Sequence, residues 1–153
     1  MKEFDYDLDY QELDFSNEKN RKLYRIGRGE QGVLLVRPYT NFICAHWRFK
    51  TPPEAIKSSN KIFSIYLDYR DAGDFIGMDM CRKFLEMGFT RARRYANHNS
   101  GKKYDSEGNV KPQEPDHMTS KYAQSARIFK HVRDLVAKSD DYVRMRKEWR
   151  SSE

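Results

Sequence analysis

The strongest constraint on the fold is the helical spacing of apolar residues that begins near residue 51. Thr51 is followed by Pro52 and then by Glu54, three residues after the threonine, which is a sequence signature of a capped helix N-terminus. The apolar positions that follow share one face of a helix and are Ala55, Ile56, Ile62, Phe63, Tyr66 and Leu67. The spacing predicts a helix that ends near Asp71.

A second helix is predicted from about residue 75, with Gly88 closing it and Thr90 capping a further, arginine-rich helix. A helix, a glycine turn and a basic helix together resemble a helix-turn-helix, whose second helix enters the DNA major groove. The match is poor, because Phe84 stands where a small residue is expected and Arg94 where a buried one is expected. A basic helix that contacts phosphates is the simpler interpretation.

The chain before residue 51 has a different pattern. Three glycines within residues 27–32 indicate a tight loop, and two runs rich in β-branched and aromatic residues follow at 33–38 and 42–49. These runs predict a hairpin. The expected fold class is therefore α+β, mostly helical, with a small antiparallel sheet near residues 32–50.

The rest of the chain divides by composition. Within residues 4–15, apolar and acidic side chains alternate as in a strand, but aspartate is rare in strands, so residues 1–18 are equally expected to form an extended acidic arm. Residues 98–118, rich in glycine, proline, serine and charge, predict an exposed loop or hairpin. Helical spacing returns over residues 119–150. The 153 residues are enough for a single domain, which we expect to span 1–153.

The loop Gly27-Arg28-Gly29-Glu30-Gln31-Gly32 matches G-x-G-x-x-G in every letter. A dinucleotide-binding turn follows a strand and opens a helix, whereas here a strand is expected to follow. The kinase version lies between two strands and requires a catalytic loop that this chain lacks, although Lys50 invites the comparison. Both interpretations are rejected in favour of a loop that bends sharply into the sheet.

Charge is distributed unevenly around the formal net charge of +6. Residues 1–18 hold seven acids and one lysine, whereas residues 82–104 hold seven bases and one acid. A basic block of this density attracts polyanions. Two interpretations compete with binding: the acidic arm neutralises the block within one molecule, or the charges form a solvated helix face.

Nucleic acid or another polyanion is the expected partner, because cations and polar donors are what phosphate contact requires. The candidate phosphate-binding residues are Arg91, Arg93, Arg94, His98, Lys102 and Lys103, with Arg48 and Lys50 as neighbours. The arm at residues 3–18 is expected to cover this patch when no ligand is bound. The choice between DNA, RNA and an acidic protein partner for an adaptor remains open.

An enzyme acting on a phosphorylated or nucleotide substrate is the alternative. On the expected strand, His46 shares a face with Arg48 and Lys50, although an ordinary polar surface is the more common explanation of such a face. The candidate catalytic residues are Glu30, His46 and Asp79, which would have to converge in one cleft.

No metal site or cofactor is predicted, because the four histidines never pair at ligand spacing. Cys44 and Cys81 are too few for a disulfide framework. No membrane segment, signal peptide or transit peptide is expected, since the longest apolar run is Gly32-Val33-Leu34-Leu35-Val36. The expected location is cytoplasmic.

Several long motifs together resemble one small family. They are Tyr24–Leu35, His46–Pro52, Gly77–Met80 through Arg91–His98, and Ser100–Tyr104. The family is catalogued as a domain of unknown function, is often labelled "cytoplasmic protein", and has members in bacteria, in tailed phages including cyanophages, and in fungi. The resemblance covers nearly the whole chain and implies one domain and a cytoplasmic setting. It implies no activity, cofactor or catalytic residue.

Overall fold

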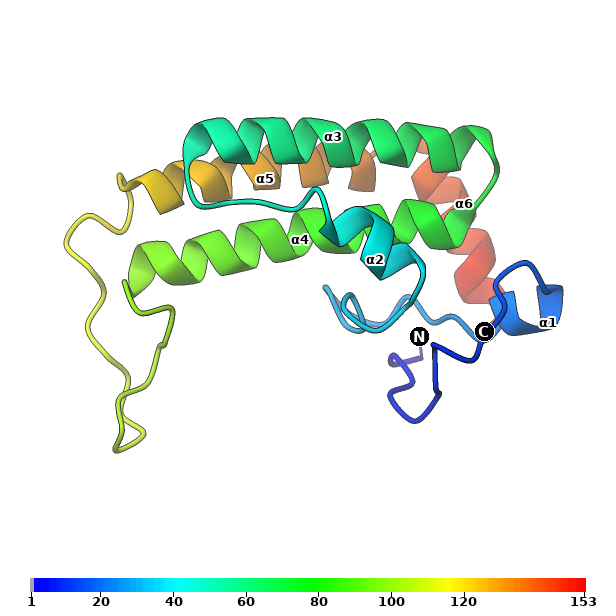
Figure 1. The fold of residues 1–153 in the computed structure, drawn as a ribbon, viewed down its shortest axis with the longest axis horizontal. Coiled ribbons are helices and arrows are strands. Elements are labelled where there is room, and N and C mark those ends of the chain that lie inside the picture. Colours follow the sequence, from blue (N-terminus) through cyan, green and yellow to red (C-terminus); the bar gives the residue numbers. More distant parts are fainter. Residues whose placement is uncertain (1) are drawn as a thin grey trace.

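A computed structural model describes residues 2–153, and all the regular secondary structure in that range is helical (Figure 1). The helices, in chain order, are α1 (Glu18–Arg21), α2 (Tyr39–Cys44), α3 (Pro52–Asp71), α4 (Phe75–Asn97), α5 (Lys121–Ala137) and α6 (Asp140–Ser151). The single β pairing among these residues is an antiparallel bridge between Tyr104 and Val110.

The helices α3, α4 and α5 pack against one another, and α2 and α6 contact α4 (Figure 1). Each of the three long helices begins where a side chain caps the first turn. Thr51 accepts a hydrogen bond from the backbone N–H of Glu54, and Asp74 and Ser120 do the same for α4 and α5. The cap of α3 is the one that the sequence predicts. These caps fix the residues at which the three helices begin.

Helix α4 runs without a break through Gly88, so the predicted turn at this glycine and the helix-turn-helix are both wrong. A Cβ atom built on Gly88 would lie 2.3 Å from the Phe129 ring of α5, and one on Gly77 would lie 2.3 Å from the Tyr69 ring of α3. The glycines are therefore close-packing positions, at which α4 admits an aromatic ring from each neighbouring helix.

The predicted sheet near residues 32–50 is also wrong, and with it the α+β class. Val33, Val36 and Ile43 are buried, whereas Leu34 and Leu35 are exposed. Burial thus recurs at a spacing of three or more residues, as in turns and helices, and not at the spacing of two that a strand requires. The Thr40 hydroxyl donates to the carbonyls of Val33 and Val36 and so ties the turns to α2.

The acidic residues 2–17 form a series of turns, in which Phe4, Tyr10 and Phe15 are buried. This segment lies at the opposite end of the molecule from residues 98–118, which extend beyond the end of α4 (Figure 1). In this structure it contacts Lys83 through Phe4, but it does not reach the candidate phosphate-binding residues at the far end of α4 and beyond it. Within residues 2–153, no helix has both the length and the apolar character needed to cross a membrane.

Gly88→Ala tests the ring contact. Helix propensity alone would stabilise the protein by about 1 kcal/mol. The contact with Phe129 leaves no room for a methyl group, and overpacking of this kind costs about 1–3 kcal/mol. We therefore expect a net loss of up to about 2 kcal/mol in the free energy of unfolding. Urea denaturation measures this, with Ser64→Ala at an exposed position of α3 as the control. An increase in stability for Gly88→Ala would contradict the packing described here.

Candidate nucleic-acid interface

The ion pairs of residues 2–153 lie within residues 3–86 and 133–153, and none involves a residue between 87 and 132. That stretch holds nine lysines and arginines against four acids. It includes the last turns of α4, the segment 98–118 and the first turns of α5. The cations of this end therefore keep their charge available for a partner.

A hollow of about 480 Å³ lies between the last turns of α4 and the bridged segment; we call it the α4 cleft. Its lining residues are Phe89, Thr90, Arg93, Arg94, Asn97, His98, Lys103, Val110, Lys111 and Gln113. Four of the predicted phosphate-binding residues are among them, and no acidic side chain is. The cleft can thus surround an anion with cations and amide donors.

Arg93 is the best anchored cation of the α4 cleft. Its guanidinium donates to the carbonyl of His117 and, over 3.2 Å, to the side-chain oxygen of Asn97. Partial burial and the neighbouring Arg127 guanidinium both lower the pKa of Arg93. The group stays charged at any ordinary pH, so an anion bound beside it would relieve this repulsion.

His98 brings a buried ring nitrogen without a hydrogen-bond partner among residues 2–153 to the lining of the α4 cleft. The residue is only 6% exposed and lines the α4 cleft, yet its Nδ1 makes no hydrogen bond within residues 2–153. A buried polar atom without a partner costs free energy in a folded protein. A bound ligand could supply the missing hydrogen bond.

The bridged segment holds the outer wall of the cleft. The backbone N–H of Lys111 donates to the carbonyl of Lys103 over 2.8 Å, and the Tyr104–Val110 bridge lies next to this pair. Lys111 therefore lies opposite Lys103. The sequence analysis missed Lys111, although pairing the two halves of the expected hairpin would have pointed to it. Tyr104 is 53% exposed, and the Lys103 ammonium lies 5.6 Å from its ring centre.

The remaining predicted phosphate contacts lie outside the α4 cleft. Arg91 is half-buried on α4, and Lys102 is exposed on the bridged segment. Arg48 lines a separate hollow beside α3, and Lys50 is exposed just before that helix. Arg91 and Lys102 can serve as the rim of the cleft, whereas Arg48 and Lys50 belong to another surface.

The three predicted catalytic residues do not share a site. Glu30 accepts a hydrogen bond from the Thr90 hydroxyl, and partial burial raises its pKa more than this bond lowers it. His46 lines the hollow beside α3. Asp79 is completely buried in α4. Their separation removes the geometric basis for the cleft in which they were expected to act.

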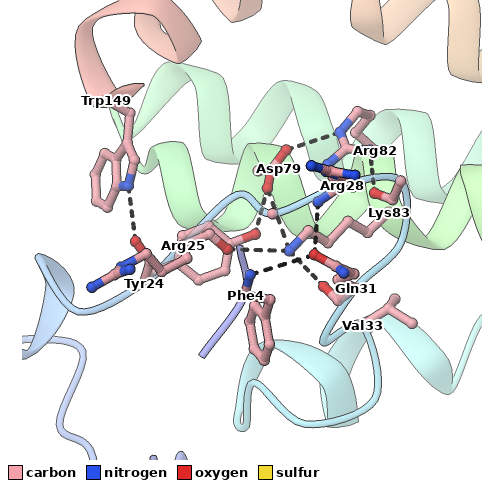
Figure 2. A network of polar contacts seen from close by, with 12 residues as sticks. Phe4, Tyr24, Arg25, Arg28, Gln31, Val33, Asp79, Arg82, Lys83 and Trp149 are labelled. Carbon is pink, nitrogen blue, oxygen red and sulfur yellow. Dashed lines mark hydrogen bonds and ion pairs between the residues drawn. The ribbon is translucent and has the colours of Figure 1, made fainter. Parts of the chain in front are cut away.

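Asp79 instead anchors a buried network (Figure 2). The hydroxyl of Tyr24 donates to Oδ2 of Asp79, and that of Tyr142 on α6 donates to Oδ1 over 2.6 Å. From α4 itself, Nε of Arg82 lies 2.9 Å from Oδ1, and Nζ of Lys83 lies 3.8 Å from Oδ2. The sequence shows that Arg82 and Lys83 lie about one helical turn after Asp79. It does not show that Tyr24 and Tyr142 contact the Asp79 carboxylate.

The pKa values in the network follow from its composition. Burial alone would raise the pKa of Asp79, but Arg82, Lys83 and the two tyrosine hydroxyls outweigh it and lower the pKa to about 2. Burial lowers the pKa of Lys83 to about 7, which attraction to Asp79 only partly offsets. Lys83 also donates to the carbonyl of Gln31 over 2.7 Å, and so holds the glycine loop against α4.

No group of histidine, cysteine, aspartate and glutamate side chains within residues 2–153 could hold a metal ion.

Comparison with protein families gives a match over almost the whole chain. Residues 5–152 match the family described as "Domain of unknown function (DUF4385)". The chain belongs to this family. No curated protein and no solved structure matches the chain significantly. The function of this family is unknown, so membership in it indicates no activity for this DUF4385 protein.

Asp79→Asn tests the buried network. The substitution leaves Arg82 and Lys83 without their counter-charge, so we expect a loss of about 3–5 kcal/mol in the free energy of unfolding at neutral pH. Denaturation by urea measures it. Asp68→Asn, an exposed position on α3, is the control and should change stability by less than about 0.5 kcal/mol.

The pH dependence of the stability of the wild type and of Asp79→Asn tests the pKa of Asp79. Because its pKa in the folded protein lies below the ordinary value of 3.8, the carboxylate stabilises the fold above about pH 4 and loses this effect as the pH falls toward 2. The stability difference between wild type and Asp79→Asn should therefore shrink over that range. A difference independent of pH would contradict the assignment.

Proposed function

We propose that this protein binds nucleic acid through the α4 cleft. The observation that carries the proposal is a group of cations that form no ion pair with any of residues 2–153 and that surround a hollow lined by no acidic side chain. Phosphate groups need only such cations and polar donors for contact. The proposal assumes the cytoplasmic location that the sequence suggests.

One cation of the α4 cleft is fixed by hydrogen bonds and two others are exposed, an arrangement that suits the sugar-phosphate backbone of a nucleic acid. Arg93 is fixed by its hydrogen bonds to Asn97 and His117, whereas Arg94 and Lys103 are exposed and make no ion pair within residues 2–153. Lys111 completes the ring from the bridged segment. The fixed arginine can define the position of one phosphate, while the exposed side chains follow the neighbouring ones.

The shape of the surface favours a single strand over a duplex. Because α4 is continuous, the chain has no separate recognition helix at this position that could enter the major groove of a duplex. Tyr104, exposed at the outer wall beside Lys103, offers a ring on which an unpaired base can stack. Contact with about four or five phosphates of a single strand would give a slope of log K against log salt near −3.

Fluorescence anisotropy with labelled single-stranded and double-stranded DNA and RNA, from about 50 to 200 mM salt, tests the proposal. We expect the tightest binding for a single strand, with the slope given above. Arg94→Ala/Lys103→Ala should weaken binding at least about 10-fold and flatten the slope by about 1 to 2.

Lys57→Ala/Lys61→Ala provides the matched control, since it removes the same charge from exposed positions of α3. It should change affinity by less than about 2-fold. Equal weakening by both double variants would mean that net charge alone drives binding and would contradict the site. Displacement of the strand by polyglutamate of matched charge would favour the alternative partner, an acidic protein. Absence of binding at the lowest salt would refute the proposal.

A further inference from the structure

No residue of the glycine loop at 27–32 lines the α4 cleft, although Glu30 accepts a hydrogen bond from Thr90 of that cleft. The glycine loop forms one wall of a second hollow, of about 790 Å³, which we call the glycine-loop cleft. The opposite wall comes from the end of α5 and from α6, and no residue lines both this cleft and the α4 cleft. We propose that the glycine-loop cleft binds the phosphate groups of a small molecule such as a nucleotide.

Charge is the first argument. The cleft is lined by six cations, Arg28, Arg82, Arg133, Arg146, Lys147 and Arg150, and by two acids, Glu86 and Asp134. Both acids are already engaged by Arg133, whose guanidinium lies 2.6 Å from Glu86 and 2.8 Å from Asp134. The remaining cations therefore face the hollow without competition from a free carboxylate of its wall.

Two of these cations are held in place by the loop itself. Arg82 donates to the carbonyl of Gly29 over 2.7 Å, and Arg150 donates to the carbonyl of Gly27 over the same distance. Arg82 is further fixed by Asp79, within the network of Figure 2. A binding site whose charged groups are already positioned loses less conformational entropy on binding.

Three other cations have charge to offer. Arg146 and Lys147 are exposed on α6, and neither takes part in the ion pairs that this helix makes within residues 2–153. Arg28 pairs with Glu3 over 2.9 Å, but both side chains are more than half exposed. An exposed pair of this kind is worth little, so a phosphate can replace Glu3 as the partner of Arg28.

Space beside the loop is the second argument. Gly29 has a φ of +51°, and a Cβ built on it would meet no atom within 4 Å. The backbone there is thus open to a ligand. The volume of the cleft falls within the roughly 300–1,000 Å³ that is usual for small-molecule sites. A nucleotide would fit these dimensions, with its phosphates between Arg28 and the cations of α6.

Isothermal titration calorimetry of the full chain with ATP, inorganic triphosphate and adenosine tests this proposal. We expect saturable binding of ATP and of triphosphate at low salt, and none of adenosine. Arg146→Ala/Lys147→Ala should weaken the binding of both phosphate ligands at least about 10-fold, as the loss of two charge-assisted contacts implies. Since both side chains are exposed, thermal unfolding should be unchanged by the substitution.

Two controls locate the binding. Lys57→Ala/Lys61→Ala removes the same charge from the hollow beside α3, and Arg94→Ala/Lys103→Ala removes it from the α4 cleft. Both should bind triphosphate within about 2-fold of the wild type. No triphosphate binding, equal weakening by all three double variants, or adenosine binding as tight as that of ATP would each overturn the proposal. The proposal for the α4 cleft is independent of these outcomes.

Discussion

The buried carboxylate of Asp79 is the interaction on which the rest of the structure depends. It accepts hydrogen bonds from Tyr24 and Tyr142, which come from opposite ends of the chain. It also balances two cations of α4, Arg82 and Lys83, both of which donate to carbonyls of the glycine loop. A buried pair contributes little net stability compared with an apolar core, but loss of one member is costly. Asp79 therefore specifies how the terminal segments attach to α4.

The charged residues of helix α4 are paired in its first half and, among the described residues, unpaired in its last turns. In its first half, Asp79, Arg82, Lys83 and Glu86 are matched within the protein, either with one another or with Arg133 of α5. In its last turns no arginine forms an ion pair within residues 2–153. The first half therefore organises the fold and positions the glycine-loop cleft, and the last turns supply the charge on which the proposed nucleic-acid interface rests.

The sequence predicted what depends on neighbouring residues and failed where distant contacts decide. The cap of α3 at Thr51 and the dense basic block are local features, and both can be read directly. The predicted turn at Gly88 was wrong because glycine serves two purposes that the sequence does not distinguish. It can end a helix, or, as here, it can make room within a helix for a neighbouring ring, that of Phe129. The sheet was wrong because β-branched runs also occur in turns. Tyr142 is 63 residues from Asp79, so the sequence gives no sign of their contact.

The central claim is that nucleic acid binds at the end of α4 where the cations lack partners. Photocrosslinking of a single-stranded oligonucleotide containing 4-thiouridine, with mass spectrometry of the crosslinked peptides, tests it directly. The account predicts crosslinks within residues 89–111, including Tyr104. Crosslinks located on α3, on α6 or in residues 2–17, with none within 89–111, would contradict it.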